Sequence, residues 1–391
     1  MGSDVQDAVT HILFLAGGNG RNAISGAEHH VLTLVQALAA RGVDTELIVL
    51  LWQTDDHIED TLQRVAASGV PVCRIERRPG PRTYFSRLVR ALDCWRRLSV
   101  VLRSRRGRVV HMHMELVMQV IAARIAGCRR LVMTIHNDEP HYRSPIVRAW
   151  FRALVAGGVH FVAITDHVRR YLASAVRVPA RNVGTITYGV PMPPRRAVSR
   201  AQLDLADSDF VVGFIGRLTA QKNIPLLLRA MAQRPSIRCV IVGDGELRVE
   251  LEQLAQTLGC RNVTFLGAQP RAAGLMPTFD VLCLPSLWEG LGVVLVEAML
   301  QGVPIVASRA GAIPEVLDDG RCGVLIDPAS VDSLCSAIDT IQHDAARRRA
   351  LTDAAQHRAA TVDGVARLAA DTHALYRTLG ERRAPATDAA A

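Results

Sequence analysis

Residues 280–308, DVLCLPSLWEGLGVVLVEAMLQGVPIVAS, decide the fold class of this chain. The apolar runs at the two ends of the segment, DVLCLP and VPIVAS, are typical of buried strands. Between them a glycine-containing loop leads into a helical pattern. Because a strand, a helix and a second strand in this order place both strands in one parallel sheet, the segment predicts an α/β fold.

The same alternation of apolar runs and helical patterns extends in both directions along the chain. We therefore expect two Rossmann-like domains, each a doubly wound parallel sheet. The strands predicted for the first domain cover residues 11–16, 45–51, 108–113, 131–136 and 159–165. Those predicted for the second domain cover residues 210–216, 237–243, 262–267, 280–285 and 303–308.

A proline-rich stretch, GVPMPPRR at 189–196, interrupts this alternation and is the predicted interdomain linker. It separates an N-terminal domain, residues 1–190, from a C-terminal domain, residues 197–365. A helix at 366–380 is expected to pack back on the first domain, and the tail at 381–391 is expected to be disordered.

The composition is that of a soluble globular protein, with 49% hydrophobic and 21% charged residues among 391. No stretch approaches the roughly 20 uncharged apolar residues that span a bilayer. The start of the chain, MGSDVQDAVT, has neither a basic region nor an apolar core. Eight cysteines are scattered singly, which predicts reduced core residues and neither a zinc site nor a disulfide framework. These features predict a cytoplasmic protein.

The basic character of the chain raises the alternative of a nucleic-acid binder, since the net charge is +9 and the sequence pI is about 9.6. The arginines are not interleaved with stacking aromatic residues and no nucleic-acid-binding motif occurs, so no nucleic-acid partner is expected. The 46 basic residues include a single lysine, Lys222. A lysine offers a compact point charge that the planar fork of arginine does not replace.

Residues that directly follow a strand are the first candidates for a site, because ligands of open parallel sheets bind beyond the carboxyl ends of the strands. In GFIGRLTAQKNIP a predicted strand ends at Gly216 and is followed by Arg217 and Lys222, where a helix pattern starts. Two cations and a helix N-terminus at one point suit a diphosphate. The alternative is a solvated loop that carries two ordinary surface charges.

Two glutamates, Glu289 and Glu297, lie in the loop and helix of the opening segment. Their separation of eight positions is a little over two helical turns, so the side chains share one face. Carboxylates beside a bound sugar would accept hydrogen bonds from its hydroxyls. The alternatives are charge complementarity at the helix N-terminus for Glu289 and a buried, satisfied carboxylate for Glu297. The backbone expected to face phosphate comprises Gly290, Leu291, Gly292 and Val293.

The loop after the first predicted strand is rich in glycine, with Gly17, Gly18 and Gly20. Their GGxG spacing lacks the third glycine that opens the helix of a dinucleotide fingerprint, so a nicotinamide site is not predicted. The next helix is expected to begin near Gly26.

Two histidines, His113 and His136, stand at the ends of predicted strands and could both point into the cleft. The alternative is that each is an ordinary packed or surface histidine. His111 alternates with His113 on the same strand and is expected to face the other way.

Taken together, these motifs closely resemble the retaining glycosyltransferases of family 4, which have the GT-B fold. The resemblance rests on the spacing of Glu289 and Glu297 around GLGVVLV, on AMLQGVPIVAS after it, and on GRLTAQKN and IVGDGE before it. It is close over residues 208–330 and looser in the first half. The segments that match there are SGAEHHVLTLVQALAARG (25–42), VVHMH (109–113), TIH (134–136), VAIT (162–165) and ITYGV (186–190).

The resemblance implies a hexosyltransferase that uses a UDP- or GDP-sugar and retains the anomeric configuration. Its acceptor would be a carbohydrate or a lipid-linked molecule in the synthesis of cell-envelope polysaccharide, lipopolysaccharide or glycolipid. No DxD motif follows a predicted strand, so catalysis without a metal is expected. The alternatives are another GT-B enzyme, such as a sugar-nucleotide epimerase or a glycogen-synthase-like transferase, and a non-catalytic protein that binds a sugar nucleotide.

By this resemblance, residues 1–190 would bind the acceptor and residues 197–365 would bind the nucleotide sugar. The resemblance also implies roles for four side chains of the donor site, as follows. Arg217 and Lys222 form the clamp on the diphosphate and stabilise the leaving group in place of a metal. Glu289 binds hydroxyls of the transferred sugar, and Glu297 binds the ribose.

The remaining contacts are expected around these four residues. Gly26 stands where the family has a glycine pair, here Ser-Gly, and lets its loop approach the donor phosphates. The backbone from Gly243 to Glu246 is expected beside the base. By the same resemblance His136 lies near the transferred sugar and the acceptor, and His113 is a candidate on the acceptor side.

A basic segment in the first half predicts a contact with a membrane surface. Residues 74–108 contain twelve arginines and only two acids. A helix over 82–106 would carry a stripe of apolar side chains between the arginines and could lie on the anionic inner face of the plasma membrane. The alternative is a helix that packs this stripe on the first sheet. The stripe consists of Phe85, Leu88, Leu92, Trp95 and Leu102.

Overall fold

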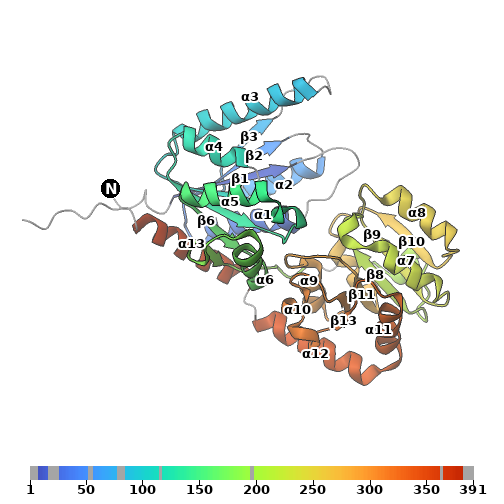
Figure 1. The fold of residues 1–391 in the computed structure, drawn as a ribbon. Helices are drawn as coiled ribbons and strands as arrows, with labels where there is room; N and C mark the ends of the chain where they lie inside the picture. Colours follow the sequence, from blue (N-terminus) through green and yellow to red (C-terminus); the bar gives the residue numbers. More distant parts are fainter. Residues whose placement is uncertain are drawn as a thin grey trace, which may run out of the picture.

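The chain folds into two α/β domains, each built on one parallel sheet, in the computed structural model (Figure 1). This is the predicted fold class. The structure describes residues 8–15, 26–51, 56–76, 84–113, 117–193, 198–361 and 364–381. The glycines at 17, 18 and 20 lie outside these residues, as do the loop residue before Gly26, part of the proline-rich stretch and the tail from 382 onward.

The first sheet has seven strands and every pairing in it is parallel. Its order from one edge to the other is β3 (Val72–Glu76), β2 (Thr45–Leu51), β1 (Val9–Leu15), β4 (Val109–His113), β5 (Arg130–Ile135), β6 (Val159–Ala163) and β7 (Val183–Thr185). The change of direction between β1 and β4 is the point where such sheets bind ligands.

The second sheet has six strands, again all parallel. Its order is β10 (Val263–Gly267), β9 (Arg238–Val242), β8 (Val211–Ile215), β11 (Val281–Leu284), β12 (Ile305–Ser308) and β13 (Val324–Ile326). Here the change of direction falls between β8 and β11, the two strands that precede Arg217 and Glu289.

Helices cover both sheets. Those of the first half are α1 (Gly26–Ala40), α2 (Asp56–Ala67), α3 (Tyr84–Arg103), α4 (Val117–Ile125), α5 (Pro145–Ala156) and α6 (Asp166–Tyr171). Those of the second half are α7 (Ile224–Ala232), α8 (Arg248–Thr257), α9 (Val293–Gln301), α10 (Ile313–Val316), α11 (Val331–His343), α12 (Ala345–Thr361) and α13 (Gly364–Glu381). Among the described residues, no helix is both long and apolar enough to cross a bilayer.

Three strands were not predicted: β3, β7 and β13. Each lies at an edge of its sheet and is short, and each has partly exposed residues. An edge strand is paired on one side only and need not be apolar on both faces, so it lacks the continuous apolar run that marks a central strand.

Different helices pack on the two faces of the first sheet. Side chains alternate between these faces along each strand. Ile12 and Met112 face the cluster that includes residues of α3 and α4. Val9 and Val109 face the opposite way, into a cluster with α1 and with Tyr376 of α13. Helix α13 therefore packs on the first domain although it follows the second one in the chain (Figure 1).

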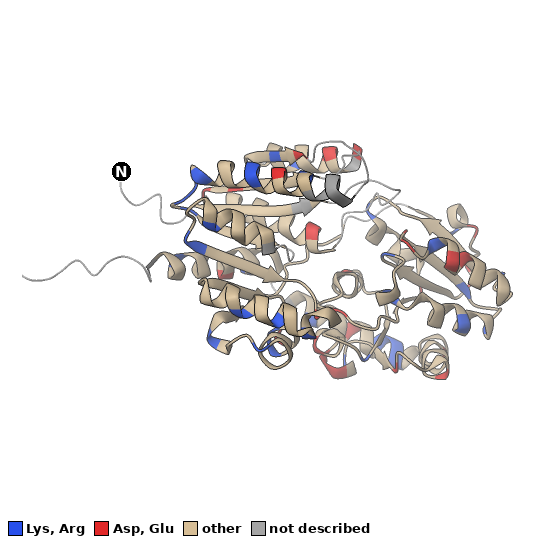
Figure 2. Ribbon diagram, turned by 45° about the horizontal axis from the view of Figure 1, so that its top comes forward, with Lys and Arg blue, Asp and Glu red and all other residues tan. Residues whose placement is uncertain are grey.

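Helix α3 is the described part of the predicted basic helix. Leu98 and Leu102 are fully buried in the core, as the packing alternative expects. Leu92 does not belong to the buried stripe, because 51% of its surface is exposed. Val89 and Val100 are exposed as well. Positions of basic and of acidic residues are found in both domains (Figure 2).

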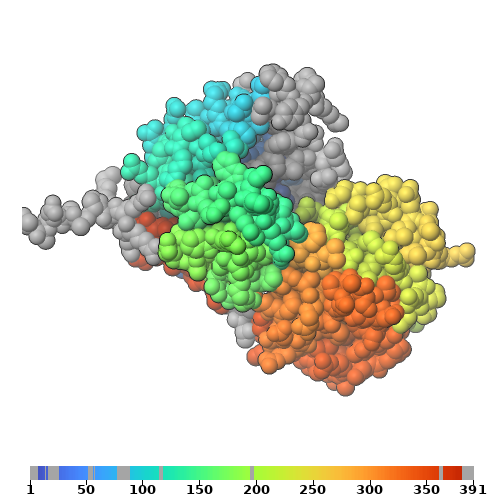
Figure 3. All heavy atoms as spheres, in the orientation of Figure 1, coloured from blue at the N-terminus to red at the C-terminus, as the bar shows by residue number. Residues whose placement is uncertain are grey.

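The domains meet where green and orange segments touch in Figure 3, and α6 takes part in the contact. The carboxylate of Glu315 on α10 accepts hydrogen bonds from the backbone N–H groups of Asp166, at 2.9 Å, and His167, at 2.7 Å. These are free donors at the helix start, where a negative charge is stabilising. The pairing fixes α6 of the first domain to α10 of the second.

Candidate functional site

The predicted cations lie in the loop after β8, where a short 3₁₀ helix, Ala220–Lys222, precedes α7. The Nζ atom of Lys222 donates a hydrogen bond to Oε1 of Glu289 in the loop after β11. The two side chains are only 15% and 7% exposed. The structure therefore joins two predicted site residues from different loops into one buried ion pair.

The surroundings of Glu289 hold it in place. Its Oε1 atom also accepts a hydrogen bond from the hydroxyl of Ser286 at 2.8 Å, and its carbonyl accepts one from the N–H of Ala312 at 2.8 Å. Gly311 lies so close that a Cβ there would be 2.4 Å from the Glu289 carbonyl oxygen. Such tight support fixes the carboxylate relative to the loop.

Arg217 contrasts with Lys222. It is exposed, and its guanidinium makes no hydrogen bond or ion pair with another described residue. Its charge is therefore available to an anionic ligand in front of the loop, while the charge of Lys222 is shared with Glu289.

The backbone after Glu289 forms part of the contact between the domains. A Cβ on Gly290 would lie 2.0 Å from the carbonyl oxygen of His136, so only glycine allows this approach. The hydroxyl of Thr165 donates a hydrogen bond to the Gly290 carbonyl at 3.0 Å. Gly292 follows in the left-handed conformation, with φ 72°, and leads into α9. Leu291 is buried between them.

Two helix N-termini approach each other across the domain boundary. A Cβ on Gly26, the first residue of α1, would lie 3.2 Å from Cγ2 of Val293, the first residue of α9. Each helix start carries free N–H groups and the positive end of a helix dipole. Their convergence favours an anion such as phosphate at this point.

Glu297 lies one turn further along α9 on the face of Val293. Burial raises the pKa of its carboxyl group to about 7. No hydrogen bond joins its carboxylate to another described residue, and the residue is partly exposed. Glu297 is therefore not the satisfied carboxylate of the alternative interpretation, and it can accept hydrogen bonds from a ligand.

The glycines of IVGDGE hold the loop after β9 against the loop that carries Arg217. A Cβ on Gly243, at φ 142°, would lie 1.9 Å from the Gly216 carbonyl oxygen, and one on Gly245 would lie 2.4 Å from that of Leu218. Glu246 in the same loop is exposed. This loop borders the predicted site without joining the ion pair.

His136 directly follows β5, and its Nδ1 atom is hydrogen-bonded to the hydroxyl of Tyr188. The ring of Tyr188 stacks on that of His30, with 3.7 Å between the centroids. Burial lowers the pKa of His136 to about 3, so the imidazole is neutral near pH 7. Its Nε2 atom has no partner among the described residues. A neutral imidazole with one free nitrogen can orient a hydroxyl group.

Sequence reasoning did not assign roles to Tyr188, Thr165 or His30. All three lie in segments quoted for the resemblance, and Tyr188 and Thr165 come shortly after strands β7 and β6. Their position after a strand was the signal that could have found them. His30 lies inside α1, and no local pattern marks it.

His113 and His111 depart from expectation. His113 is fully buried, with Nε2 3.0 Å from Nδ1 of His11, and does not open toward the cleft as His136 does. The prediction that His111 faces the other way is wrong, because the two ring centroids are 4.1 Å apart. Residues two apart on a strand lie on the same face, so the alternation places both rings together.

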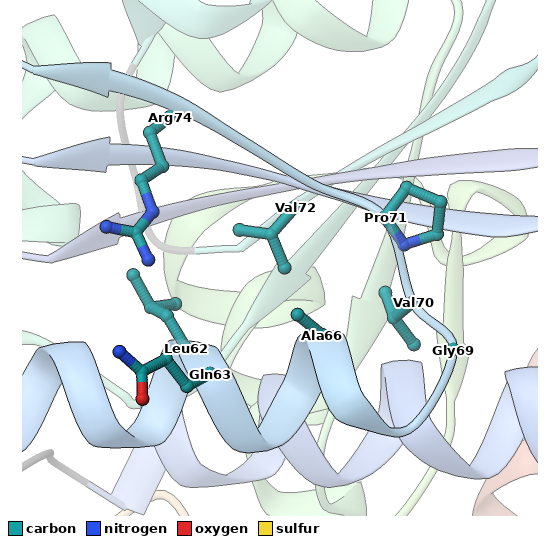
Figure 4. Close-up of a pocket in the computed structure, with 8 residues that line it drawn as sticks. All are labelled: Leu62, Gln63, Ala66, Gly69, Val70, Pro71, Val72 and Arg74. Carbon is teal, nitrogen blue, oxygen red and sulfur yellow. The ribbon is translucent and has the colours of Figure 1, made fainter.

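A surface pocket of about 380 Å³ lies elsewhere, between α2 and β3 (Figure 4). Leu62, Val70 and Val72 form its apolar part, and Arg74 stands at one end. None of the predicted site residues lines it.

The structure thus brings together most of the predicted site at the domain boundary. The ion pair of Lys222 and Glu289 leads through Gly290 to His136, and the start of α9 lies against the start of α1. The combination of cations, helix N-termini and a neutral imidazole can bind a phosphate and orient a hydroxyl beside it.

Two family models match the chain, one on each domain. The model described as Glycosyltransferase Family 4 matches residues 24–192. The model described as Glycosyl transferases group 1 matches residues 195–358. The two matches together run through both sheets.

Relatives of known name agree with the family models. The chain is 30% identical over 325 residues to the MMP alpha-(1->4)-mannosyltransferase of Mycolicibacterium hassiacum, a match that covers 76% of this chain and 75% of that protein. It is 29% identical over 238 residues to the Vi polysaccharide biosynthesis protein VipC/TviE of Salmonella typhi, covering 56% of this chain and 41% of that protein. The matched part thus spans about two fifths of the length of some curated relatives.

A solved structure of similar architecture is that of Anabaena Alr3699/HepE in complex with UDP-glucose. The two chains superpose with a TM-score of 0.74 at 23% identity, over 94% of this chain and 99% of the other. A structural likeness at this identity establishes that the two chains share a fold.

Proposed function

Since the chain belongs to the family 4 glycosyltransferases and has the GT-B fold, we propose that it moves a hexose from a UDP- or GDP-sugar to an acceptor hydroxyl with retention of configuration. The observation that carries this proposal is the meeting of Lys222, the start of α9 and His136 at the domain boundary. The diphosphate, the sugar and the acceptor each have a matching group there.

The diphosphate is bound without a metal. Arg217 offers a free guanidinium, and the starts of α1 and α9 offer backbone N–H groups. Lys222 contacts the phosphate while Glu289 keeps its ammonium in position. These fixed positive groups stabilise the charge that develops on the leaving nucleoside diphosphate.

The sugar and the ribose have separate carboxylate partners. Glu289 accepts hydrogen bonds from sugar hydroxyls through its second oxygen, since Oε1 is occupied by Lys222 and Ser286. Glu297 accepts hydrogen bonds from the ribose hydroxyls, since its carboxylate makes none with another described residue. Gly243 and Glu246 lie in the loop proposed to border the base.

The transfer step takes place on one face of the sugar. The acceptor oxygen forms a bond to the anomeric carbon from the side on which the bond to the diphosphate breaks. The acceptor proton passes to a phosphate oxygen of the leaving group, so the products are the glycoside and the nucleoside diphosphate. His136, as a neutral imidazole, orients the sugar and the acceptor hydroxyl through Nε2. His113 supports His136 from behind, with 5.9 Å between the ring centroids.

The acceptor is proposed to be a carbohydrate or lipid-linked molecule of envelope polysaccharide synthesis at the inner face of the plasma membrane. The outer face of α3 supports a membrane contact, because Val89, Leu92 and Val100 are exposed beside Arg96 and Arg103. Apolar side chains among arginines bind anionic lipid surfaces.

The experiment is a donor screen. The protein is incubated with UDP-, GDP- and ADP-hexoses and a membrane extract, and both the released nucleotide and the labelled lipid or glycan are measured. We expect turnover with one UDP- or GDP-sugar, with no increase on addition of Mg²⁺. Nucleotide release that needs the extract establishes transfer to an acceptor. No turnover with any donor would reject the enzymatic proposal, and a strict need for Mg²⁺ would reject the metal-free clamp.

A further inference from the structure

A cluster of buried imidazoles lies within the first domain, apart from the ion pair of the donor site. His11 comes from β1, and His111 and His113 come from β4. Strand register places His11 directly beside His111, and His113 follows two residues later on the same face. The three side chains are almost inaccessible to solvent, at 0%, 1% and 0% exposure. One ligand atom of each lies within 4.8 Å of the others.

The protonation of these rings suits metal binding. Burial lowers the pKa of all three, and that of His11 falls to about 3. Each ring is therefore neutral near pH 7 and keeps one nitrogen lone pair, which is the form that binds a metal.

The hydrogen bonds of the described residues leave the cluster incompletely satisfied. Nδ1 of His11 and Nε2 of His113 are 3.0 Å apart and share one proton between them. The other nitrogen of each ring, Nε2 of His11 and Nδ1 of His113, has no partner among the described residues. A metal ion bound by Nδ1 of His11 and Nε2 of His113 would take the place of the shared proton, which would move to the outer nitrogen of its ring.

His111 is oriented by two hydroxyl groups. Its Nδ1 is 2.6 Å from the hydroxyl of Tyr376 on α13, and its Nε2 is 2.7 Å from the hydroxyl of Thr134 on β5. Histidine ligands of metals usually have the second ring nitrogen held in this way, which fixes the ring. Whichever nitrogen of His111 turns to a metal, the other keeps a hydroxyl partner.

From this arrangement we propose that His11, His111 and His113 bind one divalent transition-metal ion, such as Zn²⁺ or Co²⁺. Imidazole nitrogen is a preferred ligand of these ions, whereas Mg²⁺ and Ca²⁺ prefer oxygen. Nitrogens around a tetrahedral zinc lie about 3.3 Å apart. The pair of His11 and His113 is already near this spacing, and rotation of the rings brings in the third nitrogen.

The ion is structural in this proposal. It joins β1 to β4, and through the hydrogen bond of His111 to Tyr376 it strengthens the attachment of α13 to the first domain. The proposed glycosyl transfer does not pass through it, because the clamp of Lys222 and Arg217 lies in the second domain. His113 also stands behind His136, so the two proposals are told apart by their measurements: metal content tests the ion, and nucleotide release tests the transfer.

The test uses the full chain without a polyhistidine tag. The protein is dialysed against Zn²⁺ and then against metal-free buffer, and bound metal is measured by elemental analysis. We expect about one zinc per chain and a higher Tm than for chelator-treated protein. The variants His11→Gln and His111→Gln should retain less than about a tenth of the metal. The control His357→Gln removes an exposed histidine of α12 and should leave the content unchanged.

A second measurement does not depend on how the variants fold. Chelator-treated wild-type protein is titrated with Co²⁺, and its visible absorption is recorded. The intense bands of a tetrahedral, nitrogen-ligated ion support the site. A spectrum that remains that of hydrated Co²⁺, or zinc bound equally by wild type and by folded His111→Gln, would overturn the proposal and leave a cluster held by hydrogen bonds alone.

Discussion

Lys222 and Glu289 are 67 positions apart in the chain, yet Nζ of the lysine donates a hydrogen bond to Oε1 of the glutamate. The pair joins the loops that follow β8 and β11, the two strands where the order of the second sheet changes direction. The single lysine of the sequence is therefore held at the place where such a sheet binds its ligand. Because one partner positions the other, the pair behaves as a unit.

Replacing Lys222 by Ala should lower turnover at least about tenfold, since a charge that stabilises the leaving group is lost. Steady-state release of nucleotide measures the effect. Stability should also fall by about 3 kcal/mol, because the buried carboxylate of Glu289 loses its partner. The control Arg261→Ala removes an exposed cation of the same domain and should change neither quantity. An unchanged rate in folded Lys222→Ala would remove the lysine from the site.

Glu297→Gln should abolish a pH dependence of nucleotide binding. The carboxyl group has a pKa of about 7, and only its ionised form accepts hydrogen bonds from both ribose hydroxyls with both oxygens. Affinity of the wild type for the nucleotide should therefore fall as pH drops from 8 to 6, and the variant should bind more weakly with little change over this range. Calorimetric titration of both proteins at both pH values measures the affinity for the nucleotide. Parallel pH profiles for the two proteins would contradict the assignment.

The buried histidines should make the protein sensitive to acid. Burial lowers the pKa of His11 and of His136 from 6.5 to about 3. Because each imidazole binds its proton more weakly in the folded state than in the unfolded state, the full stability is present above pH 6.5. The free energy of unfolding falls by about 1.4 kcal/mol per pH unit for each group as the pH drops from 6.5 toward 3. Glu297 acts in the opposite sense between pH 4.5 and 7, since burial raises its pKa. The lowered pKa values of several histidines have a larger effect on stability than the raised pKa of one glutamate.

Stability measured by urea unfolding should accordingly rise from pH 5 to pH 6.5, and it should rise less steeply in His11→Gln. The control His357→Gln concerns an exposed histidine and should keep the slope of the wild type. A wild-type stability that is flat or decreasing over this range would show that the cluster does not titrate as the burial requires.

Gly290→Ala should open the contact between the domains. The new methyl group would lie 2.0 Å from the carbonyl oxygen of His136, and backbone atoms cannot yield as a flexible side chain can. We expect a loss of about 1–3 kcal/mol in stability and a marked fall in turnover, since His136 and the start of α9 move apart. The control Gly184→Ala places its Cβ 3.5 Å from Nε2 of His160, an ordinary contact. Equal turnover in both variants would contradict the role of this contact.

Local patterns predicted the central strands well, because a strand buried on both faces must be apolar throughout. They also singled out Lys222 and Glu289 as candidates, since positions after a strand follow from the order of elements along the chain. The helix face predicted to be shared by Glu289 and Glu297 was wrong, because α9 begins only at Val293 and Glu289 lies in the loop before it. Three edge strands, β3, β7 and β13, escaped prediction, because a strand paired on one side need not carry a continuous apolar run.

The sequence by itself determined the two parallel sheets, the resemblance to family 4 and the residues at the carboxyl ends of the strands. Only the tertiary structure decided which of these residues meet. It paired Lys222 with Glu289, set Gly290 against His136 and placed His11 beside the histidines of β4. Such contacts join segments far apart in the chain, and their energies depend on burial and distance in three dimensions, which no local periodicity contains.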